Sequence, residues 1–201
     1  MSNLRANEIL IEALTDCDHK KFDESKSNIK NIGKKTNDID NNIIKVLALY
    51  SPEARDLREI VAYFKITNEL NRACSSSRSF IKGFNDICTD IDKEIINKYA
   101  LPLQKSTTKS IILVKQMLEN SCDDEIRELY NEVIIEENKT DDLYELIEKN
   151  LLTQKDLRID DFNRIHNMLK TLRKSAKVAD RSVSIASLLL YIGNGGSLQQ
   201  T

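Results

Sequence analysis

Residues 126–151 read IRELYNEVIIEENKTDDLYELIEKNL, and this stretch decides the fold. Side chains of one helical face recur in it at alternating intervals of four and three residues, which marks a single stripe along about seven turns of α-helix. So sustained a pattern is typical of long helices that pack nearly parallel or antiparallel. The stripe consists of Ile126, Tyr130, Val133, Glu137, Thr140, Tyr144, Ile147 and Leu151.

The same spacing recurs in the rest of the chain. It runs through residues 162–190, through 22–50, and again from Leu57 to Asn71. Two weak internal matches, at shifts of 105 and 101 positions, relate early segments to late ones. The sequence therefore predicts an all-α protein with two pseudo-repeated three-helix bundles packed side by side, made of six long antiparallel helices.

The length of 201 residues favours one domain. Within residues 1–201 we expect a first three-helix half over 1–86 and a second over 87–192. The glycines at 193–196 are expected to end the last helix and to begin a flexible tail over 193–201.

The chain has only 5 glycines and 2 prolines, too few for a fold rich in tight turns. Ser51 and Pro52 form a typical helix start, with a capping hydroxyl followed by proline at the first helical position. Pro102 lies inside a helical pattern, so we expect it to kink that helix or to divide it near Leu101.

Composition excludes several classes of function. The net charge of −2 argues against a general nucleic-acid binder. The longest apolar runs, 111–114 and 187–192, are far shorter than the ~20 residues of a membrane span, and the first residues lack the apolar core of a secretory signal, so we expect a cytoplasmic protein. The four cysteines form no Cys-x-x-Cys pair, and no nucleotide-binding or nucleophile motif occurs, so we expect no enzyme.

Glu137 is the unusual residue of the 126–151 stripe, because its neighbours along the stripe are expected to face the core. Asp141 follows one turn later, and Asp180 flanks small residues of the last helix. Three converging carboxylates need compensation, and oxygen ligands of this kind suit iron, manganese, magnesium or zinc. The alternative is that Glu137 pairs with lysines of 170–177 or turns to solvent, and that Asp180 bonds its basic neighbours.

Charge is also uneven along the chain. Residues 119–148 contain twelve acidic and two basic side chains, whereas 170–181 contain five basic side chains and one acidic. Neighbouring antiparallel helices with complementary surfaces explain this distribution. A docking ridge for a basic partner is the alternative.

A family resemblance rests on residues 48–58, which read ALYSPEARDLR and are followed by Lys65 and Ile66. This stretch resembles the PhoU family of phosphate-transport regulators, which has a very similar sequence at the turn into its third helix. More weakly, residues 174–186 resemble the second copy of the family's signature helix. The resemblance implies two three-helix bundles. The residues that carry the motif are Pro52, Arg55, Asp56 and Arg58.

The resemblance also implies where metal would bind, because family members hold metal clusters on acidic pairs of each half. The second half keeps acids at Glu137, Asp141 and Asp180. The first half has lost nearly all of its ligands. The remaining matched positions are Thr36, Asp40, Asn71, Ser75 and Ala176.

By resemblance, the chain is expected to be a non-enzymatic regulator of phosphate transport and phosphate-responsive signalling. Its expected partners are a phosphate ABC transporter ATPase and a sensor histidine kinase. The chain is expected to associate with the membrane only by binding these partners. A homodimer and no nucleic acid are expected. The alternatives are a carboxylate-bound metal protein holding iron, zinc or another cation, and a divergent paralogue that regulates another transporter.

Overall fold

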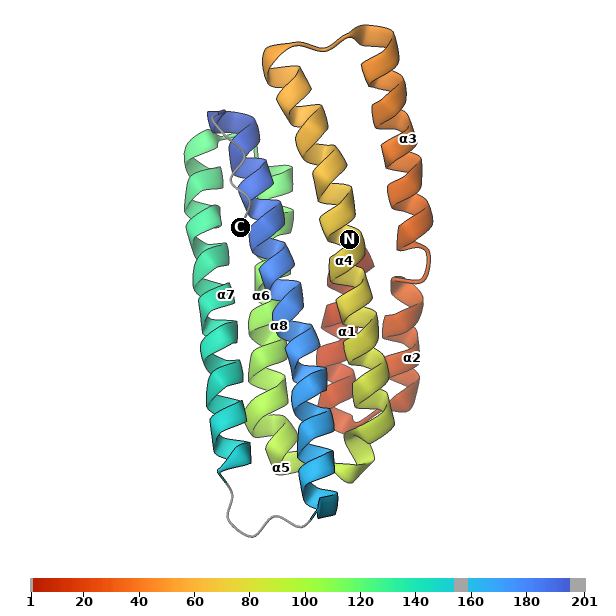
Figure 1. Cartoon of the computed structure of the whole chain (residues 1–201), viewed down its shortest axis with the longest axis vertical. Helices are drawn as coiled ribbons and strands as arrows, with labels where there is room; N and C mark the ends of the chain where they lie inside the picture. Colours follow the sequence, from red (N-terminus) through yellow and green to blue (C-terminus); the bar gives the residue numbers. More distant parts are fainter. Residues whose placement is uncertain (1, 154–158, 196–201) are drawn as a thin grey trace.

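The computed structural model describes residues 2–153 and 159–195, and its regular elements there are all helical (Figure 1). The first half comprises α1 (Ser2–Asp16), α2 (His19–Asn28), α3 (Ile32–Tyr50) and α4 (Ala54–Ile87). A connecting segment follows, with η1 (Cys88–Asp90), α5 (Lys93–Ile95) and the π-helical η2 (Ile96–Ala100). The second half comprises α6 (Leu101–Glu119), α7 (Asp123–Leu152) and α8 (Ile159–Asn194).

The long helices lie along one axis, and α4 packs beside α8 where the halves meet (Figure 1). On one side of this pair α6 and α7 complete the second bundle. On the other side α1, α2 and α3 complete the first. The predicted all-α fold of two three-helix bundles is confirmed. Within the described residues, no helix is both long and apolar enough to span a membrane.

The middle helix of the first bundle is broken, whereas the 22–50 stripe suggested one continuous helix. It divides into α2 and α3 around Ile29, whose backbone N–H bonds the carbonyls of the last turn of α2. Ile29 is fully buried, and Arg78 Nη2 of α4 donates a hydrogen bond to its carbonyl oxygen at 3.2 Å. The tertiary contacts of Ile29 thus stabilise a break that the periodicity does not reveal.

The predicted helix start at Ser51 and Pro52 is wrong by two residues. Ser51 instead ends α3 in a left-handed conformation (φ 42°), and α4 begins at Ala54 after Glu53. Proline disfavours the right-handed helical conformation in the residue before it, so the chain leaves the helix at Ser51.

Pro102 does not end its helix, but the helix changes from the π-helical η2 to α6 at Leu101, next to the proline. It is the second residue of α6, and η2 and α5 precede it without interruption. The expected tail is only partly described: Gly193 and Asn194 still belong to α8, and residues 196–201 lie outside the described part.

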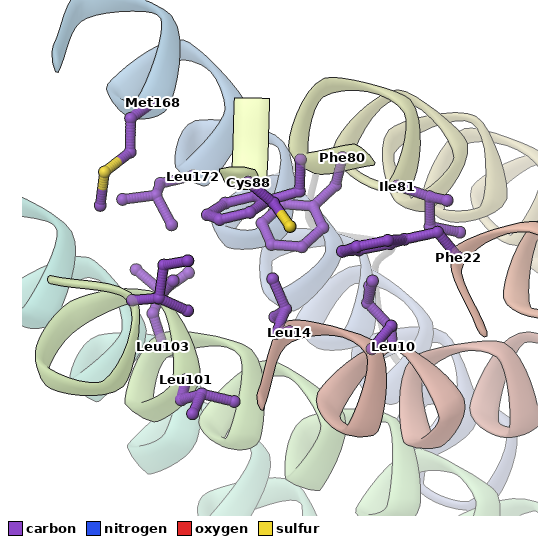
Figure 2. Close-up of a cluster of buried hydrophobic side chains, with 14 of the residues drawn as sticks. Leu10, Leu14, Phe22, Phe80, Ile81, Cys88, Leu101, Leu103, Met168 and Leu172 are labelled. Atoms are coloured by element: carbon purple, nitrogen blue, oxygen red, sulfur yellow. The ribbon is translucent and has the colours of Figure 1, made fainter. Parts of the chain in front are cut away.

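Two apolar clusters form the core. The larger one lies where α1 and α2 pack on α4, α6 and α8, and Figure 2 shows Leu14, Phe80, Leu103 and Leu172 converging in it. The second cluster joins α4, α6, α7 and α8 and includes Ala62. No residue of α1 belongs to the second cluster.

A layer of buried polar side chains joins the two halves. Gln104 of α6 donates to Asn7 Oδ1 of α1 at 2.9 Å, and Ser175 of α8 donates to Gln104 Oε1 at 2.8 Å. All three side chains are about 1% exposed. Because each buried group finds a partner only in one alignment of the helices, this layer favours a unique register between the halves.

The outer ends of α3 and α4 project beyond α1 (Figure 1). We define the α3–α4 tip as residues 44–58. Its large apolar side chains are unusually exposed, with Leu49 and Tyr50 at 73% and 74%. Ile44, Leu47 and Leu57 are also exposed.

Candidate functional site

The three acidic residues singled out in the sequence lie together in the structure. Glu137 and Asp141 are one turn apart on α7, and Asp180 faces them from α8. One carboxylate oxygen of each lies within 4.8 Å of the others. Carboxylate oxygens at this spacing can bind one cation together, and such hard oxygen ligands favour a hard metal cation.

The electrostatics of this cluster favour neutralisation. Burial raises the pKa of Glu137, and the nearby carboxylates of Asp141 and Asp180 raise it further. Burial and Asp141 likewise raise the pKa of Asp180, against the opposing effect of Arg173 and Arg181. A bound cation or a proton would relieve this repulsion.

In the described part of the chain, the basic partners that could neutralise these carboxylates form no ion pair with Glu137 or Asp180. Arg181 instead pairs with Glu69 of α4 at 3.1 Å. The cluster therefore keeps its negative charges close together without a direct basic partner.

Replacing Asp180 by asparagine is expected to stabilise the metal-free protein by about 1 kcal/mol at pH 7, a figure that allows for partial screening by solvent. The pKa of Asp180 is higher in the folded protein than in the unfolded chain. As the pH rises, Asp180 therefore ionises in the unfolded chain first, and the wild type loses stability until the pH passes the pKa of the folded state. Below the ordinary pKa near 4 the two proteins should be equally stable. Urea unfolding in chelator at pH 3.5 and pH 7 measures both differences, and Asp142→Asn on the exposed face of α7 is the control. A stabilisation of equal size at both pH values would show that it does not arise from the raised pKa of Asp180.

Sequence reasoning missed the most deeply buried acid of α7. Glu136 is 5% exposed, accepts a hydrogen bond from Ser106, and pairs with Lys109 at 3.1 Å and Lys139 at 3.5 Å. Burial raises its pKa, but these partners outweigh burial and leave the pKa lowered. Glu136 thus forms a satisfied link between α6 and α7 rather than a ligand.

Three of the equivalent positions of the first half, Thr36, Asp40 and Asn71, form hydrogen bonds between helices. Asn71 Nδ2 donates to Thr36 Oγ1 at 2.7 Å, and Thr67 Oγ1 donates to Asp40 Oδ1 at 2.6 Å. Only one carboxylate is present among these four side chains. Among the residues that the structure describes, three acidic groups converge in the second half alone, so the two halves are asymmetric.

The acidic run of 119–148 does not pair with the basic run of α8. Among the ion pairs of the described residues, those that α7 makes to other helices reach α6, through Lys109. One contact between the two runs is a cation–π interaction, in which Arg173 lies 5.0 Å from the ring centre of Tyr144. Complementarity between α7 and α8 is thus a minor part of the explanation.

The family-like motif occupies the α3–α4 tip. Pro52 lies in the linker between the helices, and Arg55, Asp56 and Arg58 lie in the first turns of α4. Arg55 and Asp56 are exposed, and Pro52 and Arg58 are half-buried. The motif residues thus lie beside the exposed apolar side chains of the tip.

Fold and site together define a class: an all-helical protein of two three-helix bundles in which one bundle keeps a carboxylate cluster. Residues 6–82 match the family model of the PhoU domain. A curated relative from Aquifex aeolicus (strain VF5), a phosphate-specific transport system accessory protein PhoU homolog, is 28% identical over 121 residues. These comparisons bear out the resemblance: residues 6–82 match the PhoU domain, and the chain is similar to PhoU proteins in sequence and in fold.

The extent of the matches differs. The alignment with the Aquifex protein covers 58% of this chain and about half, 50%, of that relative. The crystal structure of PhoU from Pseudomonas aeruginosa superposes with a TM-score of 0.83, covering 97% of this chain and 91% of that one at 18% identity. That structural likeness shows the fold, over both halves.

Proposed function

We propose that this protein is a non-enzymatic regulator of phosphate transport and phosphate-responsive signalling. The observation that carries the proposal is the PhoU-domain match over residues 6–82, which includes the tip motif. The curated relative is named as an accessory protein of a phosphate-specific transport system, which supports a regulatory role. In this proposal the protein acts in the cytoplasm, as a homodimer, by contact with a phosphate ABC transporter ATPase and a sensor histidine kinase.

The α3–α4 tip is the surface we propose for the transporter contact. A group of exposed apolar side chains with charged side chains at its edge is typical of protein interfaces. Leu49 and Tyr50 supply the apolar part, and Arg55 and Asp56 supply charges that can fix orientation.

Deletion of the gene is expected to derepress phosphate uptake and phosphatase expression in cells grown with high phosphate, because the restraint on the transporter is lost. Both quantities can be measured in the native cell, with the restored wild-type gene as control. Unchanged uptake and phosphatase levels would reject the phosphate role and favour a paralogue that serves another transporter.

The variant Leu49→Ser/Tyr50→Ser tests the tip. Both side chains are more than 70% exposed, so we expect stability to change by less than about 0.5 kcal/mol while recovery of the transporter ATPase in a pull-down falls at least tenfold. Ile135→Ser on α7 is the matched control, because Ile135 is 62% exposed but lies far along the chain from the motif. Equal recovery with both variants would remove the tip from the interface.

A second function, metal binding by the second half, is favoured by the convergence of Glu137, Asp141 and Asp180. We propose that this cluster holds one iron, zinc or similar cation, which would relieve the repulsion between the carboxylates. Metal binding and regulation are compatible in one protein, so the two proposals need separate tests.

Elemental analysis of protein purified without chelator, followed by calorimetric titration with Zn²⁺ or Fe³⁺, tests the metal site. We expect one bound ion, and a loss of affinity of at least tenfold in Glu137→Gln and in Asp180→Asn. Asp40→Asn in the first half is the control, because Asp40 is already bonded to Thr67. The absence of bound metal, or equal affinity in all four proteins, would reject the site.

A further inference from the structure

Two cysteines far apart in the sequence meet at one end of the first bundle. Cys17 follows α1, Cys88 follows α4, and a disulfide joins them across 71 positions. Their Cα atoms are 5.9 Å apart, within the usual range for a disulfide. The backbone alone therefore places the two side chains where they can form a covalent link.

The neighbouring contacts hold the same two segments together. Cys17 has a left-handed backbone (φ 53°), which turns the chain from α1 into α2, and Asp18 caps α2. His19 Nδ1 of α2 donates to Asn85 Oδ1 of α4 at 2.7 Å. The corner between α1 and α2 is thus fixed to the end of α4 at two adjacent points, one covalent and one not.

The two sulfur positions differ in access. Cys88 is 3% exposed and lies in the larger core cluster, near Phe80 and Leu14 in Figure 2. Cys17 is partly exposed at the turn. A small thiol can therefore reach the Cys17 side of the bond from solvent, whereas the Cys88 side is covered.

The other two cysteines do not compete for this pairing. Cys74 is buried within α4, and burial raises the pKa of its thiol to about 11, which keeps it protonated and unreactive. Cys122 is exposed and stands at the N-cap position of α7, in the second half. One defined pair is thus available for thiol–disulfide exchange.

We propose that Cys17 and Cys88 form a reversible redox clip that fastens the α1–α2 corner to the end of α4. For a protein of the cytoplasm, where permanent disulfides are rare, a partly accessible pair of this kind suits a response to the thiol–disulfide balance. When the clip is reduced, only noncovalent contacts hold the corner, so α1 and α2 open more often. This inference does not depend on the phosphate role.

Glutathione disulfide can serve as the oxidant that forms the disulfide between Cys17 and Cys88. The Cys17 thiolate attacks one sulfur of glutathione disulfide, forms a mixed disulfide and releases one glutathione thiolate. The Cys88 thiolate then attacks the Cys17 sulfur, which closes the protein disulfide and releases the second glutathione. Two electrons pass from the cysteines to glutathione disulfide, and the two protons of the cysteine thiols end on the two glutathiones.

The full chain can be equilibrated in glutathione buffers of varied ratio, then alkylated in denaturant and weighed by mass spectrometry. Of the 4 cysteines, we expect all to be alkylated in the reduced protein and half of them in the oxidised protein, with one two-electron transition between the states. The unfolding temperature of the wild type should fall by about 10 °C on reduction. Hydrogen exchange in α1 and α2 should quicken at the same time.

Variants separate the clip from other effects. Cys17→Ser and Cys88→Ser should lose the response to glutathione ratio, and Cys122→Ser should keep it. Complete alkylation in every buffer would overturn the clip, and so would a disulfide that glutathione cannot reduce at any ratio, which would be a permanent cross-link. If a serine variant fails to fold, the alkylation and unfolding temperature of the wild type with and without reductant still test the proposal.

Discussion

Replacing Phe84 by alanine is expected to lower the free energy of unfolding by about 3–5 kcal/mol. Phe84 is fully buried in the larger core cluster, and its ring centre lies 4.9 Å from that of Phe80 on the same face of α4. The substitution removes a whole aromatic ring from a closely packed region where α1 and α2 meet the second half. The helices around it cannot close the resulting cavity without moving the backbone.

Urea unfolding followed by circular dichroism measures this loss, and Phe64→Ala is the matched control. Phe64 lies on the same helix but is 47% exposed, so its replacement should change stability by less than about 1 kcal/mol. A small effect of Phe84→Ala, or effects of equal size at both positions, would show that the larger cluster does not dominate the stability of the fold.

The long helices were predictable because their pattern is local. In α7 the stripe residues Val133, Thr140, Tyr144, Ile147 and Leu151 are all buried, as their spacing indicated. The same periodicity cannot show where a helix breaks, since a break need not interrupt the apolar pattern. The division at Ile29 depends on Arg78 of another helix, so no local reading of residues 22–50 could have found it.

The candidate site was predictable in part for the same reason. Residues at i and i+4 share a face, which brings Glu137 close to Asp141, but the contribution of Asp180 depended on the pairing of α7 with α8. The stripe fits Glu136 as well as Glu137. Both residues lie three or four positions from Val133 on one side and from Thr140 on the other, so the spacing does not choose between them. Lys139, three residues after Glu136, is the local signal that could have identified the paired acid.

Long-range pairs were the hardest to foresee. Cys17 and Cys88 have no common sequence motif, and their contact arises from the reversal of the chain through α2, α3 and α4. The hydrogen bond from Asn71 to Thr36 in the first half likewise follows from helix packing. Sequence spacing reports on one helix at a time, whereas these contacts depend on how the helices are placed.

Replacing Gly83 by alanine is expected to destabilise the protein by about 1–3 kcal/mol, because α4 and α8 approach closely at this glycine. An added Cβ would lie 2.6 Å from Thr171 Oγ1 and 2.9 Å from Thr171 Cγ2. Thr171 cannot readily turn away, since it is 8% exposed and its hydroxyl donates to the Asn167 carbonyl at 2.8 Å. The helices must therefore separate at the seam that joins the two bundles.

The control for this prediction is Gly33→Ala in α3, where an added Cβ meets nothing within 4 Å. Alanine there should stabilise the protein by up to about 1 kcal/mol through its higher helix propensity, so the two substitutions differ in sign. In the Gly83→Ala background, Thr171→Ala should recover part of the loss, because it removes the atoms that clash. Thermal and urea unfolding of the three variants and the wild type measure these differences. Stabilisation by Gly83→Ala would mean that the halves are not packed closely at this point, whereas rescue by Thr171→Ala would locate the strain at the contact between α4 and α8.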